Sequence, residues 1–482
     1  MPSPSLVVAS NHRPSEHRLA PERTPSERAE GGLTTALDPI LEQFGETWVS
    51  WENGEDDRET AVARDGIEGP PNAPAWRLRR VRWSQEEKGG DPGYAAQVLW
   101  PLCHIALDRI AYRKTLWDGY VAANERSARA VLEASRGRPG LVWVRDFRLA
   151  LLPRLIRAAR PAANVAVFWP IPWPGPNVFR ILPEGREVLE GLLAADSLVF
   201  QTHGAAKLFV DCARQFLNAE ADEAGTVVAY QGHRTGVVAH PASVDLRAIS
   251  RIANTPAVKR AMAPIRERLG LVTGVRLGLG LDRLDYTEGL LKRLWALETF
   301  FDRHAHHVGK FTFLLIGIQT RSEADAAGRG GEVVRQAVSE INGRFGRGGW
   351  RPIEYLEGRI GFVERVAYYR MAELALASSA CDGMNLTAKE YVASQFDGNG
   401  LLLVSQMAGA AEELTDALVI NPYDLEGTAD AIAQALEMPT EERRRRMRAM
   451  RGYLRIHDIH AWTASCLREA GILPPLSDGV AV

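Results

Sequence analysis

The chain carries the stretch Cys381-Asp382-Gly383-Met384-Asn385-Leu386-Thr387-Ala388-Lys389-Glu390, in which a turn with one acid and one glycine runs into a predicted helix. Amides at the start of a helix favour a phosphate, because they have no partner within the helix. Asp382 can accept a hydrogen bond from a sugar hydroxyl. Glu390, one turn into the helix, can accept hydrogen bonds from two ribose hydroxyls. The stretch therefore predicts a nucleotide-sugar site, and the alternative is a capped surface helix behind an ordinary turn.

Short β-branched runs alternate with longer amphipathic stretches, a pattern typical of βα units around a parallel sheet. Two series of runs are separated by a hinge-like stretch, His240-Pro241-Ala242-Ser243. We therefore expect an α/β protein of two doubly wound, Rossmann-like domains, 1–243 and 244–455, with a cleft between them. Ligands bind such domains beyond the carboxyl ends of the strands. The strand candidates are 6–9, 141–144, 165–168 and 197–200, then 275–281, 311–316, 375–378, 401–404 and 418–420.

The composition is that of an ordinary globular protein and argues against several function classes. Of 482 residues, 46% are hydrophobic and 24% charged, and the net charge of −2 gives no basic field for nucleic acid. The sequence shows neither a membrane-spanning run nor a signal peptide, so we expect a cytoplasmic protein without membrane partners. Four scattered cysteines indicate reduced thiols, and a homo-oligomer is left open. The run Arg443-Arg444-Arg445-Arg446, in a predicted helix capped by Thr440, indicates a solvated face.

Three further constellations follow predicted strands. Ser10-Asn11-His12-Arg13-Pro14 is followed by Gly31-Gly32-Leu33, where paired glycines let the backbone approach a phosphate, although such pairs usually mark only a turn. In Asp282-Arg283-Leu284-Asp285-Tyr286, the planar guanidinium suits a diphosphate, and a salt bridge to either flanking aspartate is the alternative. Trp143-Val144-Arg145-Asp146-Phe147 places Asp146 at a strand end, facing the presumed cleft.

In the order and spacing of these blocks, the chain resembles trehalose-6-phosphate synthases, the retaining glycosyltransferases of GT-B fold. The resemblance runs through nearly the whole chain. It implies transfer of a sugar from a nucleoside-diphosphate donor to a small-molecule acceptor, without a metal or other cofactor. It also implies that the last segment, 456–482, crosses back over the first domain. The other blocks that carry it are Phe179-Arg180-Ile181-Leu182-Pro183, Ile341-Asn342-Gly343-Arg344-Phe345-Gly346 and Ala408-Gly409-Ala410-Ala411.

The resemblance assigns roles to the matching donor residues. Arg283 would hold the diphosphate, Glu390 the ribose, and Asp382 with the backbone after it the sugar hydroxyls. Asp146 would face the reacting centre, so Asp146, Arg283 and Asp382 are expected to be catalytic. The leaving phosphate would accept the acceptor's proton in a front-face attack. The donor-binding residues implied in this way are Gly31, Gly32, Arg283, Glu288, Asp382, Gly383, Met384, Asn385, Leu386, Thr387 and Glu390.

The acceptor side departs from the family. The family arginine that grips the acceptor phosphate is His12 here, with Arg13 beside it, and a family tyrosine at the same site is Asp91. An acid would repel a phosphate. Arg321 keeps the third family ligand, so two of the three phosphate contacts are lost or altered. An acceptor other than glucose 6-phosphate is therefore expected. The acceptor-binding residues implied are His12, Arg13, Arg145 and Arg321.

The donor side departs as well. The family histidine that contacts the donor sugar is Pro170, which offers no side-chain hydrogen bond and fits a sugar that is larger or modified at its 6-position. Glu288 stands where the family has the lysine that pairs with Arg283 on the diphosphate. Lys292, four residues after Glu288, could neutralise its charge or contact the donor phosphate itself.

Three hypotheses follow from these matches and departures. The first is a transferase of specialised metabolism that moves a sugar or sugar-like group from a GDP-linked donor to an acceptor such as the thiol of ergothioneine. Pseudo-glycosyltransferases of validamycin-type pathways and the lincosamide-pathway thiol glycosyltransferase are relatives of this kind. The second is a trehalose-6-phosphate synthase that uses UDP- or GDP-glucose and glucose 6-phosphate. The third is a catalytically silent regulatory paralogue, for which Glu288 is the main argument.

Overall fold

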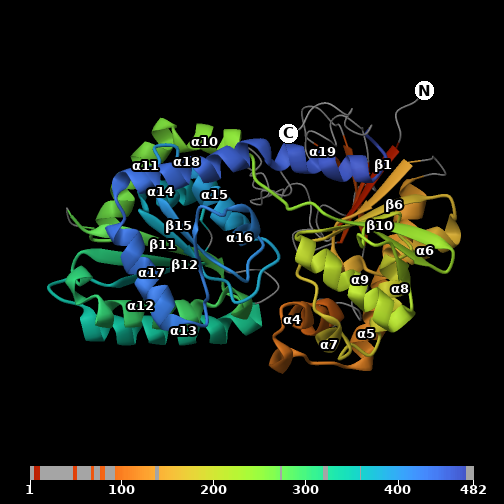
Figure 1. Cartoon of the computed structure of the whole chain (residues 1–482), viewed down its shortest axis with the longest axis horizontal. Helices are drawn as coiled ribbons and strands as arrows, with labels where there is room; N and C mark the ends of the chain where they lie inside the picture. Colours follow the sequence, from red (N-terminus) through yellow and green to blue (C-terminus); the bar gives the residue numbers. More distant parts are fainter. Residues whose placement is uncertain are drawn as a thin grey trace. The chain divides into compact units, whose positions relative to one another are not determined.

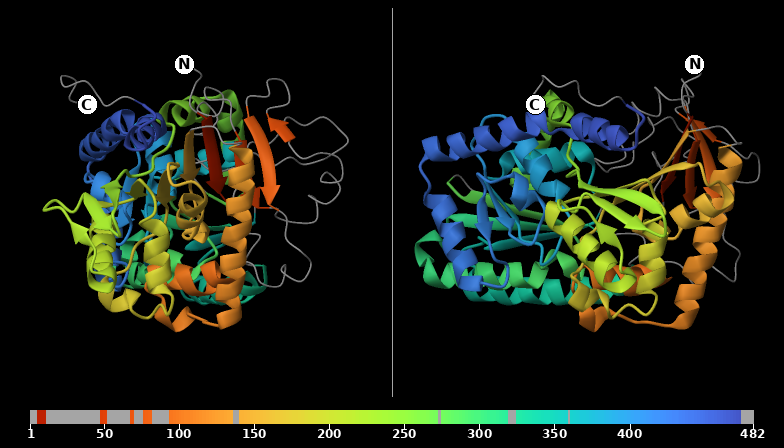
Figure 2. Two further views of the ribbon diagram at one scale, coloured as in Figure 1. Left: turned by 90° about the vertical axis from the view of Figure 1, so that its right-hand side faces the viewer. Right: turned by 45° about the vertical axis from the view of Figure 1, so that its right-hand side comes forward.

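The structure is a computed structural model and describes residues 5–10, 47–51, 67–69, 76–81, 93–135, 140–271, 274–318, 324–358 and 360–473. The chain forms two units. The first combines Met1–Ala242 with His460–Val482, and the second is continuous over Ser243–Ile459. Each unit is built on its own, mostly parallel sheet with helices packed on it, which confirms the predicted α/β class with two Rossmann-like sheets (Figures 1 and 2).

The first unit contains, among its described residues, a ten-stranded sheet in the order β3-β4-β2-β1-β5-β6-β7-β10-β9-β8. Its central strands run parallel and are buried, as uninterrupted apolar runs such as Val165-Ala166-Val167-Phe168 require. Antiparallel pairs close both edges. The strands are β1 (Ser5–Ser10), β2 (Thr47–Trp51), β3 (Ile67–Gly69), β4 (Trp76–Val81), β5 (Gly140–Val144), β6 (Asn164–Trp169), β7 (Ser197–Phe200), β8 (Glu220–Ala221), β9 (Val227–Tyr230) and β10 (His233–Ala239).

The last helix of the chain, α19 (Ile459–Glu469), packs on the sheet of the first unit. The ring of Trp462 lies 5.1 Å from that of Phe168 and 6.1 Å from that of Trp143, and its Nε1 donates to His240 O at 2.9 Å. The C-terminal segment therefore completes the core of a domain that the N-terminal half begins. The other described helices of this unit are α4 (Trp100–Cys103), α5 (Lys114–Ala134), α6 (Leu152–Ala159), α7 (Pro176–Phe179), α8 (Gly185–Leu192) and α9 (His203–Leu217).

The second unit has a six-stranded, wholly parallel sheet in the order β13-β12-β11-β14-β15-β16. This is the order of a dinucleotide-binding sheet, with the reversal of direction between β11 and β14. Its strands are β11 (Arg276–Arg283), β12 (Phe311–Ile318), β13 (Ile353–Glu357), β14 (Leu374–Ala377), β15 (Leu401–Ser405) and β16 (Leu418–Ile420). Its helices are α10 (Leu246–Ala253), α11 (Pro256–Arg268), α12 (Leu290–Arg303), α13 (Ala324–Phe345), α14 (Phe362–Met371), α15 (Leu386–Ser394), α16 (Ala410–Glu413), α17 (Leu425–Glu437) and α18 (Thr440–Ile456).

Alternate residues of these strands enter two separate apolar cores, one on each face of the sheet. On β12, Leu314 and Ile316 belong to the core that includes residues of α10, α11, α14, α15 and α18. Phe313 and Leu315 belong to the core that includes residues of α12, α13 and α17. The two-residue period of a strand gives this division, so the apolar run 311–316 is buried on both sides.

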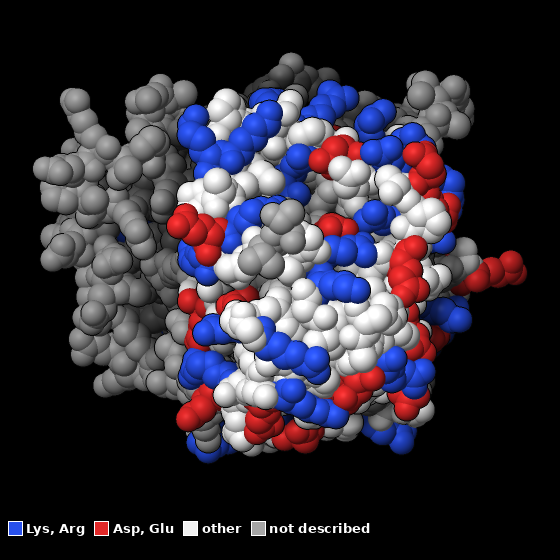
Figure 3. All heavy atoms as spheres, turned by 90° about the vertical axis from the view of Figure 1, so that its left-hand side faces the viewer, with Lys and Arg blue, Asp and Glu red and all other residues white. Residues whose placement is uncertain are grey.

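Helix α18 carries the arginine run predicted to be a solvated face, and its arginines are paired locally. Arg445 and Arg446 each donate from Nε to Glu442 at 2.8 Å, and Arg443 contacts Glu373 at 3.2 Å. Basic and acidic side chains are interspersed on the face of the molecule drawn in Figure 3. Within the described part of the chain, no helix is long and apolar enough to span a membrane.

A charged side chain, Arg293 of α12, is buried where β11 and β14 end. It is 1% exposed and pairs with Asp282 through Nη1 and, at 3.1 Å, through Nη2. Its Nε also donates to Ser378 Oγ at 2.8 Å. Gly280 leaves the space that this guanidinium fills, since a Cβ at that position would overlap Nη1. A buried ion pair of this kind depends on both partners, because either charge left alone is costly to bury.

We expect Gly280→Ala to lower the free energy of unfolding by about 2 kcal/mol or more, because the methyl group displaces Arg293 from Asp282. Urea unfolding would measure the change. Gly343→Ala is the matched control, because Gly343 is an exposed position of α13 with open space around its Cβ direction. There the same substitution should stabilise by about 0.5–1 kcal/mol. Equal effects at the two glycines would contradict the role given to Gly280.

Candidate active site

Two loops meet at the carboxyl edge of the second sheet. Because β11 lies between β12 and β14, the chain leaves the carboxyl ends of β11 and β14 in opposite directions. Ligands of doubly wound sheets bind at such a switch point. The loop after β11 contains the 3-10 turn η4 (Tyr286–Glu288), and the loop after β14 leads into α15. Most of the predicted donor residues that the structure describes lie on these two loops.

Backbone contacts fasten the two loops to each other. Ala380 N donates to Thr287 O at 2.8 Å. Gly289, at the start of α12, has φ of +67°, and a Cβ there would lie 2.8 Å from Ser378 O. Glycine is needed at this position for both its left-handed conformation and the close approach of the second loop. The loops are thus held as one rigid surface.

A hydrogen-bonded pair, Arg283 and Glu288, lies on this surface. Arg283 Nε donates to Glu288 Oε1 at 3.1 Å, and Ser379 Oγ donates to Glu288 Oε2 at 3.1 Å. The Arg283 side chain is 42% exposed and accessible to an anion, whereas the Glu288 side chain is only 8% exposed. Burial raises the pKa of the Glu288 carboxyl from 4.5 to about 8; Arg283 opposes the rise, and nearby Asp282 and Asp382 add to it. Glu288 is therefore expected to hold a proton near neutral pH.

The expected partners of this pair differ from those found. Lys292 was expected to neutralise Glu288 or to lean toward the phosphate, but its Nζ lies over the ring of Tyr423, 4.8 Å from the centroid. The alternative of a salt bridge between Arg283 and a flanking aspartate is not tested for Asp285, whereas Asp282 has another partner. Asp282 pairs with Arg293, and Arg283 pairs with Glu288 across the turn η4.

The turn ahead of α15 is built by its own side chains. Asp382 Oδ1 accepts from Met384 N at 3.1 Å, and Asn385 adopts the left-handed region with φ of 75°. Asn385 Oδ1 caps the helix by accepting from Ala388 N at 2.9 Å, while its Nδ2 donates to Ser379 Oγ at 3.1 Å. A capped helix is therefore present, but α15 is not a surface helix, since all of its residues from Ala388 onward are buried. Gly383 is buried in the same turn, followed by the half-buried Leu386 and Thr387.

The two charged residues of the predicted helix start have different environments. Glu390 is 6% exposed, and its Oε2 accepts from Tyr369 OH at 2.9 Å and lies 3.4 Å from Arg365 Nη1. Lys389 is fully buried and pairs with Glu413, which also accepts from Tyr453 OH at 2.8 Å. Lys389 therefore ties α15 to α16 and α18, and only Glu390 lies among groups that could serve a ligand.

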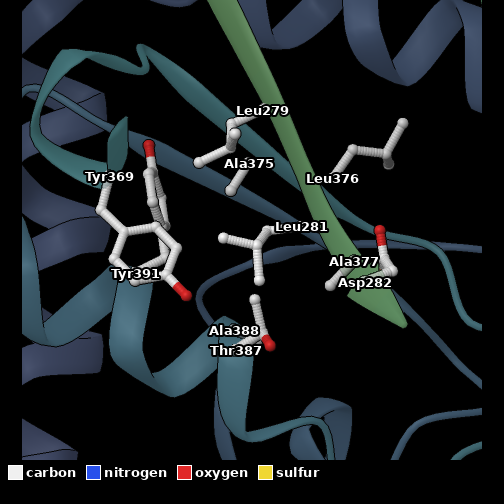
Figure 4. Close-up of a pocket in the computed structure, with 10 residues that line it drawn as sticks. All are labelled: Leu279, Leu281, Asp282, Tyr369, Ala375, Leu376, Ala377, Thr387, Ala388 and Tyr391. Atoms are coloured by element: carbon white, nitrogen blue, oxygen red, sulfur yellow. The ribbon is translucent and has the colours of Figure 1, made fainter. Parts of the chain in front are cut away.

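A small cavity lies beneath this site. Its volume is about 10 Å³, room for a single water molecule. Figure 4 shows Asp282 at the end of β11 and Thr387 and Ala388 at the start of α15 around it, with Tyr369 and Tyr391 on its other side. A donor molecule is too large for this cavity, so any donor would bind above it, at the loop surface.

In the first unit, Asp146 and Arg145 follow β5. Asp146 is 3% exposed, and its Oδ1 accepts from Arg148 N at 2.9 Å and from Arg148 Nη1 at 3.1 Å. Arg145, predicted to bind the acceptor, is buried with its guanidinium 5.1 Å from the ring of Trp143 and 5.5 Å from that of Trp462. Burial lowers the pKa of Arg145 to about 10. The rings of Trp143 and Trp462 pack against it, but its Nε and Nη2 have no hydrogen-bond partner among the described residues, and its role toward the acceptor stays a prediction.

Several predicted site residues lie outside the described part of the chain. They belong to the phosphate cradle of the first domain and to the acceptor side. Their roles stay predictions. These residues are Gly31, Gly32, His12, Arg13, Asp91 and Arg321.

Three side chains that hold the candidate site together are not among the residues that the sequence predicts for it. Arg293 holds Asp282, Ser379 holds Glu288, and Tyr369 holds Glu390. A signal existed for Arg293, since it is a charge between Leu290 and Leu294 on the apolar side of a predicted helix. No local pattern marks Ser379 or Tyr369, because their partners are distant in sequence.

Comparison with known proteins places the chain among sugar-transferring enzymes. The sequence model of the family described as Glycosyltransferase family 20 matches residues 4–471. The trehalose-6-phosphate synthase of Mycolicibacterium smegmatis is 33% identical over 471 residues, 96% of this chain and 91% of that protein. The bifunctional trehalose-6-phosphate synthase/phosphatase of Thermoproteus tenax is 36% identical over 470 residues, 95% of this chain and 62% of that longer protein.

Solved structures are similar over nearly the whole chain. The α,α-trehalose-phosphate synthase (UDP-forming) of Burkholderia vietnamiensis has a TM-score of 0.86 and 29% identity, covering 97% of this chain and 100% of its own. An E. coli structure bound with UDP-2-fluoro glucose has a TM-score of 0.86 and 28% identity, covering 98% and 100%. A Burkholderia xenovorans synthase in complex with glucose-6-phosphate has a TM-score of 0.85 and 28% identity, covering 97% and 100%. These similarities confirm the predicted GT-B fold.

The raised pKa of Glu288 predicts a pH-dependent stability. The folded state keeps this proton up to about pH 8, whereas the unfolded chain releases it near 4.5, so the free energy of unfolding falls as the pH rises between these values. Glu288→Gln removes this dependence. Relative to wild type, the variant should gain on the order of 4 kcal/mol between about pH 5 and about pH 9, measured by urea unfolding. Parallel pH curves for the two proteins would contradict the assignment. Glu340→Gln, at an exposed position of α13, is the control.

Proposed function

The chain belongs to glycosyltransferase family 20 and is a glycosyltransferase, and we propose that it makes trehalose 6-phosphate, the reaction for which its relatives are named. A glucosyl group would pass from a nucleoside-diphosphate glucose to glucose 6-phosphate with retention of configuration. The observation that supports this best is the pair of fastened loops at the switch point. They gather Arg283, Asp382 and the start of α15 on one surface.

In this proposal, the donor binds along the loop surface of the second unit. The half-exposed Arg283 holds the diphosphate from one side, and the amides at the start of α15 hold it from the other. Glu390, oriented by Tyr369 and Arg365, accepts hydrogen bonds from the ribose hydroxyls.

Catalysis would then rest on positioning and charge stabilisation. Arg283 and the helix amides neutralise the charge that develops on the leaving phosphate, so the reaction needs no metal or other cofactor. The leaving phosphate accepts the proton of the attacking hydroxyl on the same face of the sugar. Asp382 and the turn after it hold the sugar, and Asp146 is the third residue that the family resemblance makes catalytic.

Glu288 fits this proposal if it acts as a neutral acid. An ionised carboxylate beside the diphosphate would repel it. With its pKa raised to about 8 by burial, the carboxyl group is protonated near neutral pH and can donate a hydrogen bond to a phosphate oxygen. Protonation also weakens its hold on Arg283. We therefore expect donor affinity to fall as the pH rises through about 8.

The sequence favoured a transferase of specialised metabolism with a GDP-linked donor and a thiol acceptor, and this function is now placed behind the synthesis of trehalose 6-phosphate. The relatives, named as trehalose-6-phosphate synthases, give that preference no support. A different acceptor stays the second candidate, because His12 and Asp91 stand at acceptor positions where the family has phosphate ligands. The silent paralogue is third, since Arg283 is engaged by Glu288 in the structure.

The proposal is tested by incubating the protein with glucose 6-phosphate and, in turn, UDP-, GDP- and ADP-glucose. Formation of trehalose 6-phosphate, detected by mass spectrometry, supports it. Donor hydrolysis or transfer only to other acceptors, such as a thiol, would favour the second candidate. Failure to bind any of the three nucleoside diphosphates in calorimetry would favour the third.

We expect Arg283→Ala to weaken nucleoside-diphosphate binding by about tenfold to a hundredfold, because one charge-assisted contact to the diphosphate is lost. Isothermal calorimetry would measure the change. Arg344→Ala is the control, since Arg344 pairs with Glu298 and Asp302 on the outer surface of the same unit. Unchanged affinity in Arg283→Ala would remove the proposed diphosphate site.

A further inference from the structure

Two histidines and a glutamate gather in the second unit, away from the loops of the candidate active site. His306 and His307 end the 3-10 turn η5 (Ala305–His307), and Glu437 ends α17. One ligand atom from each lies within 4.8 Å of the others. The turn η5 precedes β12, and α17 returns from the carboxyl end of β16, so the cluster lies at the amino edge of the sheet. The switch point is about one strand length away, roughly 25 Å for eight residues.

The distances within the cluster suit a tetrahedral metal ion. His306 Nε2 lies 2.9 Å and His307 Nε2 lies 3.5 Å from the same oxygen, Glu437 Oε1. Zinc bonds to imidazole nitrogen and carboxylate oxygen are about 2.0–2.1 Å long, which places two tetrahedral ligands about 3.3 Å apart. The two measured distances lie on either side of that value. Two imidazoles and one carboxylate are also a ligand set that zinc uses, with water in the fourth position.

The buried histidine supplies an independent reason for a ligand. His307 is 7% exposed, and its ring stacks on Phe300 with centroids 5.2 Å apart, which fixes the direction of its outer edge. Among the described residues, its Nε2 has no hydrogen-bond partner. Buried polar atoms are nearly always satisfied, so an atom held this way toward a carboxylate indicates that something binds between them.

The surroundings of the cluster favour a cation and let it enter. The side chains of His306 and Glu437 are 58% and 57% exposed, so an ion reaches the cluster from solvent. The carbonyl end of α17 places partial negative charge beside Glu437. Arg276 donates to the nearby Leu436 O, but its own charge is offset by Glu373, 2.8 Å from its Nε.

We propose that His306, His307 and Glu437 form a site for Zn²⁺ or a divalent transition-metal ion of the same ligand preference. The ion replaces the direct contacts among the three side chains and fastens the turn η5 to the end of α17. Helices α12 and α17 already pack against each other on this face of the sheet. The site is structural and does not take part in sugar transfer.

The test is zinc binding by the full chain, stripped of metal with a chelator and free of any histidine tag. Equilibrium dialysis with elemental analysis should find one Zn²⁺ per chain. Glu437→Gln, an exposed substitution that keeps the shape of the side chain, and His307→Ala should each weaken binding at least tenfold. Co²⁺ in place of Zn²⁺ should give the visible absorption of a tetrahedral site, and Zn²⁺ should raise the midpoint of thermal unfolding of wild type.

Asp430→Asn is the matched control, because Asp430 lies on the same helix and contacts another histidine of the same region, His304, at 2.9 Å. It should bind Zn²⁺ as tightly as wild type. The proposal is overturned if wild type retains no stoichiometric Zn²⁺, or if Glu437→Gln binds it as tightly as Asp430→Asn does. Because Glu437→Gln leaves the buried ring in place, a loss of folding in His307→Ala does not affect this comparison.

Discussion

The buried ion pair between Arg293 and Asp282 holds in place the region on which the rest of the second unit depends. From α12, the guanidinium reaches past Gly280 to the end of β11 and, through Ser378, to the end of β14. The chain leaves these two strands in opposite directions, and the hydrogen bonds of the sheet do not extend to the loops beyond the strand ends. The ion pair supplies that constraint together with the backbone contact between Ala380 N and Thr287 O, because either charge left alone is costly to bury. The loops that carry Arg283 and Asp382 inherit their separation from it, which is the pre-organisation that a binding surface for a charged ligand needs.

Much of the fold could be predicted from apolar runs alone, and the exceptions share a cause. The interior strands β5, β6, β7 and β12 are nearly continuous apolar runs, and β11 alternates leucine with glycine, since both faces of these strands are buried. Strand β4 was missed because Arg77, Arg79 and Arg80 interrupt it, and the edge strand β13 because glutamates begin and end its sequence Ile353–Glu357. Strand β13 lies at a sheet edge and β4 lies next to the edge strand β3, and charged residues deprive both of the continuous apolar run that identifies the other interior strands.

Some contacts of the candidate site join near neighbours in sequence, and others join residues that are far apart in sequence. The turn from Asp382 to Asn385 and the helix after it are built by contacts between near neighbours, so their sequence was informative. Ser379 with Glu288 and Tyr369 with Glu390 are 91 and 21 residues apart, and only the folded sheet brings them together. Glu288 illustrates the difference most clearly. In the sequence it is a charge of the wrong sign beside an arginine, whereas its burial in the structure makes it an acid that keeps its proton.

The return of α19 to the first unit has a consequence for the order in which the two units fold during synthesis. The second unit is one continuous segment and can close as soon as residue 459 has left the ribosome. The first unit must wait for Trp462, which covers Phe168 and Trp143, although most of its chain was made more than two hundred residues earlier. At translation rates of about 5–20 residues per second, that delay is roughly ten to forty seconds. During this interval Phe168 and Trp143 of the first sheet lack their cover on the nascent chain, so the domain synthesised first is the last to complete its core.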